Sequence, residues 1–133
     1  MASKPEKIVL DTNIFIYFLI SGSFQKLDKK LKNTQVKLLF SEELLDEFLQ
    51  VVGRPKFKKY FSHKEVTNLL NELHRFAELI NVNSKINVCR DKKDNFLLAL
   101  CHDGKADFLI TGDEELLAIK KFKKTQSSSF LII

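Results

Sequence analysis

The 133-residue chain is predicted to fold as an α/β protein, a three-layer α/β/α sandwich with a short central parallel sheet and Rossmann-like connections. Short β-branched or apolar runs alternate with longer segments in which apolar residues recur at helical spacing. The short runs lack polar alternation, which is typical of strands buried on both faces. Because neither a linker nor an internal repeat is visible, we expect a single domain over residues 1–133 with right-handed βαβ units.

The chain opens with a predicted strand at residues 8–10, which are Ile, Val and Leu. Residues 14–20 continue as an apolar helix, closed by the Ser-Gly-Ser sequence at 21–23. A polar, lysine-rich surface helix is expected over 25–35, followed by a second strand over 36–40.

Serine caps define the next two helices. Ser41 precedes a helix that runs to about Val52, and the Gly-Arg-Pro sequence at 53–55 stops it. Ser62 precedes a helix over residues 63–79. Its core face is expected to consist of apolar residues at helical spacing, namely Leu69, Leu70, Leu73, Phe76, Ala77 and Ile80.

Predicted strands and helices also alternate in the last third of the chain. Residues 86–89 are expected to be a short extended piece, and a largely buried helix begins at Asp94 and ends at Gly104. A third strand follows over 108–110, with Thr-Gly-Asp directly after it. A final helix spans roughly 114–121, and the tail at 130–133 is a candidate last strand.

The composition restricts the class of protein. Lys and Arg number 22 against 17 Asp and Glu, and this net charge of +5 permits a polyanionic partner without requiring one. The longest apolar run, residues 14–20, is far shorter than the roughly 20 residues that span a bilayer, and no secretory leader is visible. Cys89 and Cys101 lack metal-ligand spacing and are expected to be reduced, buried thiols. We therefore expect a cytoplasmic protein with no membrane association.

Carboxylates follow two of the predicted strands. Asp11 comes directly after the first strand, and Asp113 follows the strand at 108–110. Because ligand sites of open α/β sheets lie beyond the carboxyl ends of the strands, we expect both side chains to enter one crevice. The neighbouring helices add further acids, namely Glu43, Asp46, Glu47, Asp91 and Asp94.

Several carboxylates in one crevice need a counter-charge. Two negative charges about 4 Å apart repel by roughly 4 kcal/mol at an effective dielectric constant of 20. Either one acid keeps its proton or a divalent cation neutralises the group. Oxygen donors favour Mg²⁺ or Mn²⁺ over zinc, and two such ions can activate water for phosphodiester hydrolysis.

Each acid also has a structural explanation. Asp113 and Asp94 are good N-caps, and for either residue alone capping is the better explanation. Asp11 is either a turn former or a functional group. Helical periodicity does not select Glu47 over Glu43 or Asp46. Composition and spacing therefore predict an acidic crevice and leave its ligands open.

The ordered motifs resemble the PIN domain, a family of small metal-dependent ribonucleases, over almost the whole chain. Residues 8–13, Ile-Val-Leu-Asp-Thr-Asn, are similar to the opening strand and signature of the family. Residues 41–48 and 53–57 resemble its glutamate helix and the loop after it, while 90–96 and 106–113 resemble its second half. The arrangement most resembles the branch that forms the toxin component of toxin–antitoxin pairs.

This resemblance implies catalytic metal binding by Asp11, Glu47, Asp94 and Asp113, with Asn13 and Thr111 orienting these groups or bound water and Asp91 assisting. It further implies an RNA substrate, Mg²⁺ or Mn²⁺ as cofactor, a small antitoxin protein that covers the acidic pocket, and a homodimer. Asp107 precedes a strand, so we expect it at the opposite end of the sheet in a structural role. The expected activity is that of a divalent-metal-dependent endoribonuclease.

Three other functions could also place acids at strand ends or combine them with a basic surface. A phosphoacceptor receiver domain needs an aspartate that closes another strand, but the strand at 36–40 closes on Ser41. A phosphatase with an aspartate nucleophile would have a second acid two residues after Asp11, where Asn13 stands. A non-catalytic RNA-binding or protein-interaction module with an idle acidic pocket remains the main alternative, and it predicts RNA binding that is independent of metal.

Overall fold

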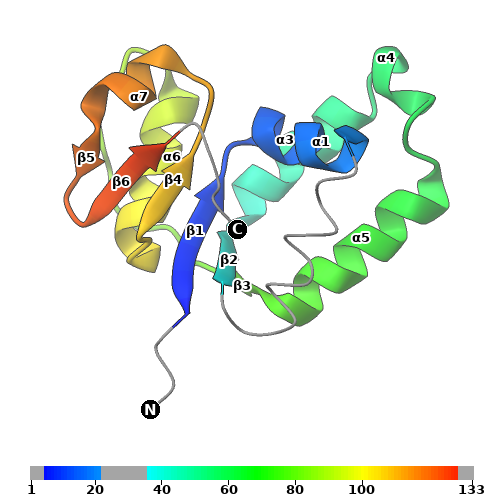
Figure 1. Cartoon of the computed structure of the whole chain (residues 1–133), viewed down its shortest axis with the longest axis horizontal. Helices are drawn as coiled ribbons and strands as arrows, with labels where there is room; N and C mark the ends of the chain where they lie inside the picture. The colour runs from blue at the N-terminus through cyan, green and yellow to red at the C-terminus, as the bar shows by residue number, and fades with distance from the viewer. Residues whose placement is uncertain (1–4, 22–35, 129–133) are drawn as a thin grey trace.

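The computed structural model describes residues 5–21 and 36–128 of the chain. These residues form a six-stranded sheet of order β3-β2-β1-β4-β6-β5, in which every neighbouring pair is parallel except β5 and β6 (Figure 1). The strands are β1 Glu6–Leu10, β2 Val36–Phe40, β3 Ala77–Leu79, β4 Phe108–Ile110, β5 Lys121–Phe122 and β6 Thr125–Ser128. The helices are α1 Thr12–Ser21, α3 Glu42–Val52, α4 Pro55–Lys58, α5 His63–Phe76, α6 Lys92–Gly104 and α7 Glu114–Ile119. The predicted α/β fold with a mostly parallel central sheet is confirmed.

Helices cover both faces of the sheet. In β1, Ile8 and Leu10 pack with residues of α1, α3 and α5, whereas Val9 packs with residues of α6 and α7. Figure 1 shows the same division, with α6 and α7 on one side of the strands and α1, α3 and α5 on the other. Because both sides of the strand are buried, β1 has no polar alternation, as expected for the centre of a parallel sheet.

Local capping fixes two of the helix starts as predicted. The Ser41 hydroxyl accepts a hydrogen bond of 3.1 Å from the Leu44 N–H, and the Ser62 hydroxyl accepts one of 3.1 Å from the Glu65 N–H. The short helix α4, which starts at Pro55 directly after the stop at Gly53, was not predicted. Its first position suits proline, whose missing N–H would have no partner there.

The predicted helix over 63–79 is wrong in its last three residues. Residues Ala77–Leu79 instead form β3, which pairs in parallel with β2. Helical spacing continues through this segment, but hydrogen bonding at the edge of the sheet decides its conformation. Residues 86–89 are not a strand, since side chains of α6 hold this segment in an irregular path.

Helix α6 starts earlier than predicted. Asp91, not Asp94, is its N-cap, and Oδ1 of Asp91 accepts a hydrogen bond of 2.9 Å from the Lys93 N–H. Asp94 therefore lies inside the first turn, where its side chain is buried. At the other end the helix includes Gly104, and Lys105 takes the left-handed conformation that ends it, with φ of 55°.

The C-terminal part differs most from the prediction. Helix α7 ends at Ile119, and the polar strand β6 then pairs in parallel with β4 and antiparallel with β5. The expected helix at 25–35 and the expected strand at 130–133 lie outside the described residues.

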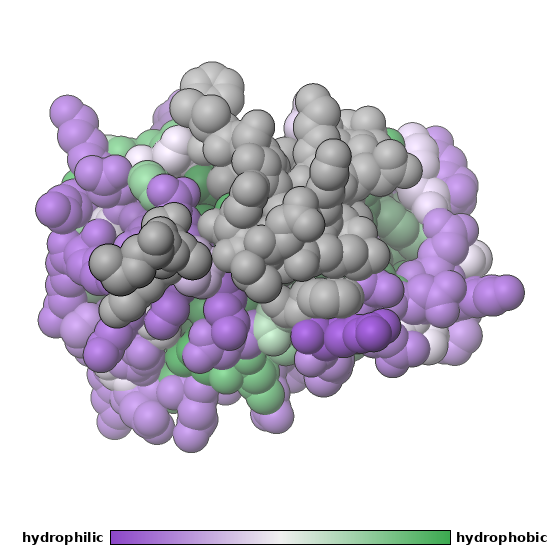
Figure 2. Space-filling view, turned by 60° about the horizontal axis from the view of Figure 1, so that its bottom comes forward, coloured by the Kyte–Doolittle hydropathy of each residue, from purple (hydrophilic) through white to green (hydrophobic). Residues whose placement is uncertain are grey.

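Hydrophilic residues dominate the described part of the face shown in Figure 2, with hydrophobic residues visible only between them. Among the helices in residues 5–21 and 36–128, none is both long enough and apolar enough to cross a membrane.

Candidate active site

The carboxyl ends of β1 and β4 meet at the centre of the sheet. The Asp11 N–H donates a hydrogen bond of 3.0 Å to the Ile110 carbonyl, so the two strands stay paired up to the first acid. From this point α1 leaves toward one face of the sheet and α7 toward the other (Figure 1). Such a switch point opens a crevice between the departing chains, which is where α/β proteins place their ligands.

Thr111 links the two acids at this crevice. Its hydroxyl donates a hydrogen bond of 2.8 Å to Oδ2 of Asp11 and accepts one of 3.1 Å from the Asp113 N–H. The side chain is fully buried. Thr111 thus orients the Asp11 carboxylate and fixes the backbone at Asp113.

Asp113 is the N-cap of α7, as its capping pattern predicted. Its Oδ1 accepts hydrogen bonds of 2.9 Å and 3.1 Å from the N–H groups of Glu115 and Leu116. Both bonds use the same oxygen, so Oδ2 is not engaged by the cap. Capping and ion binding are therefore compatible at this residue.

Asp94 is the most perturbed acid of the described residues. Its side chain is only 7% exposed. Burial in the first place, and then the negative charges of neighbouring carboxylates, raise its pKa to about 6. In decreasing order of effect, those carboxylates are Asp113, Asp91, Asp11 and Glu115. Acids from the end of β1 and from the starts of α6 and α7 therefore share one electrostatic environment.

Glu47 lies apart from these acids, in a groove between helices α3 and α6. It is half-buried on α3 and lines a groove of about 370 Å³ whose opposite side carries Lys92 and Lys93 of α6. Its charge is not among those that raise the pKa of Asp94, and Glu43 and Asp46 line the same groove. The charges of Asp11 and Asp113 therefore reach Asp94, whereas Glu47 lies in the neighbouring groove.

The remaining predicted residues have simpler positions. Asp91 is exposed and caps α6, and Asn13 is exposed in the first turn of α1. Asp107 lies at the opposite end of the sheet, where it accepts a 2.8 Å hydrogen bond from the Lys7 N–H and pairs with Lys124 at 3.4 Å. The expected structural role of Asp107 is confirmed.

The donor set suits a hard divalent cation. All three grouped side chains offer carboxylate oxygens, and the buried carboxylate of Asp94 lies among like charges. In residues 5–21 and 36–128, no three His, Cys, Asp or Glu side chains lie close enough together to coordinate one ion. Mg²⁺ is usually held by one or two protein carboxylates, with waters and substrate phosphate oxygens as further ligands. The crevice fits that mode of binding.

Two residues of the site were missed from the sequence. Glu115 adds negative charge near Asp94, and its Oε1 accepts a 3.0 Å hydrogen bond from the Arg90 N–H. Its position two residues after Asp113, in the first turn of a helix, was the available signal. Asn95 is buried, and its amide holds the backbone of Val88 and Cys89 through three hydrogen bonds of 2.7 to 2.9 Å.

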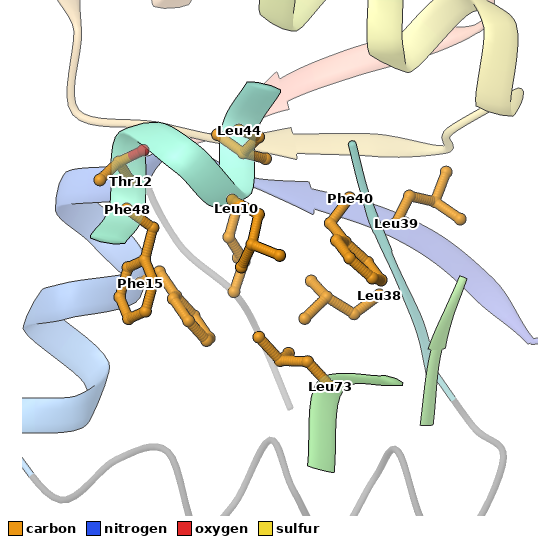
Figure 3. Close-up of a pocket in the computed structure, with 10 residues that line it drawn as sticks. Leu10, Thr12, Phe15, Leu38, Leu39, Phe40, Leu44, Phe48 and Leu73 are labelled. Atoms are coloured by element: carbon orange, nitrogen blue, oxygen red, sulfur yellow. The ribbon is translucent and has the colours of Figure 1, made fainter. Parts of the chain in front are cut away.

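A separate, small cavity of about 30 Å³ lies between β1, β2 and helices α1, α3 and α5 (Figure 3). Its wall is apolar except for Thr12, whose buried hydroxyl has no hydrogen-bond partner among the described residues. No carboxylate is among the described residues that line this cavity. Cys89 and Cys101 are buried and free, as expected, and burial raises the pKa of Cys101 to about 12.

The chain is similar in sequence to known proteins. Residues 7–115 match the model of the PIN domain. The chain is also similar to the uncharacterized protein MJ1680 of Methanocaldococcus jannaschii, with 29% identity over 127 residues that cover 89% of this chain and 77% of the relative.

Proposed function

This chain belongs to the PIN domain family, and on that premise we propose that it is a Mg²⁺- or Mn²⁺-dependent endoribonuclease. The observation that carries the proposal is the burial of Asp94 beside Asp11 and Asp113. A carboxylate in such a place is stabilised by a divalent cation, and its environment is otherwise unfavourable to charge.

We assign different roles to the residues of the crevice. Asp11, Asp94 and Asp113 would hold one or two ions, each bound directly by one or two of these carboxylates and completed by waters and phosphate oxygens. Thr111 keeps Asp11 in position through its 2.8 Å hydrogen bond. Glu47 would contribute from the opposite wall of the groove. When bound, one or two divalent ions supply a water of lowered pKa and stabilise the charge on the departing oxygen. No histidine is assigned a proton-transfer role, since His63, His74 and His102 are all exposed.

The biological setting is part of the proposal. Sequence resemblance supports a toxin of a toxin–antitoxin pair, with an antitoxin protein that covers the acidic crevice and a homodimeric assembly. The net charge of +5 is compatible with an RNA substrate.

Cleavage of a labelled RNA pool tests the activity. Wild-type protein and Asp11→Asn are compared with Mg²⁺, with Mn²⁺ and with EDTA. We expect cleavage by the wild type with either metal, and none with EDTA or by the variant. If folded wild-type protein binds RNA but cleaves nothing with any ion, the alternative of a non-catalytic RNA-binding module replaces the nuclease.

A further inference from the structure

We propose that a groove beside the acidic crevice binds single-stranded RNA, with Phe96 stacking on a base and Lys85 and Lys92 contacting phosphates. The inference rests on the proposed function, because it assigns the RNA of that reaction to a surface. The groove measures about 620 Å³ and runs between helix α6 and the segment at 84–87.

The wall of the groove is fixed at both ends by side chains of α6. Asp103 accepts hydrogen bonds from the N–H groups of Asn83 and Ser84, at 2.6 Å and 2.9 Å, and from the Ser84 hydroxyl. At the other end, Asn95 holds the N–H groups of residues 88 and 89. The irregular segment between these anchors is therefore held in place before any ligand arrives, which lowers the entropy lost on binding.

Phe96 is an aromatic side chain without a place in the core. It is partly exposed and belongs to neither of the two hydrophobic clusters that the described residues form. It lines this groove and also the groove that contains Glu47, so it lies where the two grooves meet. A ring in this position offers a surface on which an unpaired base can stack.

The charge of the groove suits a phosphate backbone. Lys85 and Lys92 are exposed, line the groove and form no ion pair with the rest of the described chain. Among the described residues that line it, none is acidic, in contrast to the groove beside Glu47. The Asn87 side chain adds a hydrogen-bonding group.

The groove and the crevice share the first turns of helix α6. Lys92 lies two residues before Asp94 in α6, and Asn95, which follows Asp94, lines the groove. A strand seated on Phe96 would therefore continue toward the three carboxylates. Because stacking on Phe96 requires an unpaired base, the geometry favours single-stranded RNA over a duplex.

Binding without cleavage tests the groove. Fluorescence anisotropy is measured with a labelled single-stranded oligonucleotide in EDTA, on the Asp11→Asn background. We expect the Lys85→Ala/Lys92→Ala double variant to weaken binding by about tenfold or more and to reduce the salt slope by about 1.4. Phe96→Leu should weaken binding on the order of tenfold with the salt slope unchanged.

Lys64→Ala is the matched control, since Lys64 is an exposed lysine on α5, across the sheet. If the groove variants bind RNA as tightly as Lys64→Ala, the inference is wrong, even where the Asp11-dependent cleavage is intact. If the groove variants lose RNA binding but the wild type does not cleave RNA with any ion, the RNA-binding role of the groove is supported and the nuclease proposal is wrong. A third outcome is that the chain copurifies with a protein that contacts Lys85 and Phe96, while RNA binding is the same in both variants as in the control. This result would contradict the inference and assign the groove to a protein partner instead.

Discussion

The Thr111 hydroxyl donates a hydrogen bond of 2.8 Å to Oδ2 of Asp11, across the ends of two neighbouring parallel strands. The same hydroxyl accepts from the Asp113 N–H. Two acids that are 102 positions apart, residues 11 and 113, are therefore oriented by one buried side chain. We expect the proposed metal site to depend on this link as well as on the carboxylates around it.

Replacing Thr111 tests the link. Thr111→Val keeps the volume but leaves the Asp113 N–H without its partner, so we expect a loss of about 1–2 kcal/mol in the free energy of unfolding. Affinity for Mn²⁺ should fall by about 10- to 100-fold, because the orientation of a ligand is lost. Thr111→Ser retains the hydroxyl and should restore most of that affinity. Equal Mn²⁺ affinity in Thr111→Val and wild type, by calorimetric titration, would separate Thr111 from the site.

The raised pKa of Asp94 predicts that the free energy of unfolding depends on pH. Its pKa is raised from 3.8 to about 6, so the native state binds this proton more tightly than the unfolded state does. The free energy of unfolding therefore falls as the pH rises from about 4 to about 6, and the loss persists at higher pH. Asp94→Asn should be more stable than wild type by about 3 kcal/mol at pH 8, with most of the difference gone by pH 4.

Denaturant unfolding at pH 4 and pH 8, without metal, measures this difference. Asp46→Asn is the control, because Asp46 is exposed on α3 and its replacement should leave stability unchanged. Adding Mg²⁺ at pH 8 should stabilise the wild type and not Asp94→Asn. A stability difference that is the same at both pH values would show that Asp94 does not carry an unfavourable charge.

Asn95 is expected to hold the segment before α6. Asn95→Ala removes three hydrogen bonds to residues 88 and 89 and leaves buried backbone groups unpaired. We expect a loss of about 3 kcal/mol in the free energy of unfolding and faster hydrogen exchange at the Val88 and Cys89 amides. Asn68→Ala, at an exposed position of α5, should change neither. Unchanged exchange at Val88 and Cys89 would contradict the role given to Asn95.

Gly104 is required by packing inside α6. A Cβ at this position would lie 2.7 Å from Cδ1 of Leu39 and 3.1 Å from Cγ1 of Ile80. Gly104→Ala should therefore cost about 1–3 kcal/mol, although alanine is normally the better helix former. Gly112→Ala is the contrast, since its Cβ would meet only Ile14 Cδ1 at 3.9 Å. A Gly104→Ala protein as stable as Gly112→Ala would show that Leu39 moves aside freely.

Sequence reasoning succeeded where local chemistry and burial agree. β1 and β2 are apolar on both faces because they lie at the centre of the sheet, and Ser41 caps α3 through its own side chain. Both features can be recognised from a few residues that are neighbours in the sequence. The crevice at Asp11 and Asp113 followed from the strand ends in the same way.

Sequence reasoning failed where the structure depends on strand pairing between distant parts of the chain, or on which of two residues caps a helix. β6 is a polar Thr-Gln-Ser-Ser segment that becomes a strand because β4 offers an unpaired edge, and Ala77–Leu79 leaves its helical pattern to pair with β2. Asp91 competes with Asp94 for the cap of α6, and only the three-dimensional environment shows that Asp94 is the buried one. The charge that Glu115 adds to the site also comes from another helix.

The chemistry of the cut ends tests the central claim most directly. RNA fragments produced by wild-type protein with Mg²⁺ or Mn²⁺ are analysed for their terminal phosphates, with Asp11→Asn and EDTA samples alongside. Attack by water leaves no 2′,3′-cyclic phosphate, so we predict metal-dependent and Asp11-dependent fragments whose ends are a simple phosphate and a hydroxyl. Cyclic phosphate ends, or fragments that form equally in EDTA or with Asp11→Asn, would contradict hydrolysis by the acidic crevice.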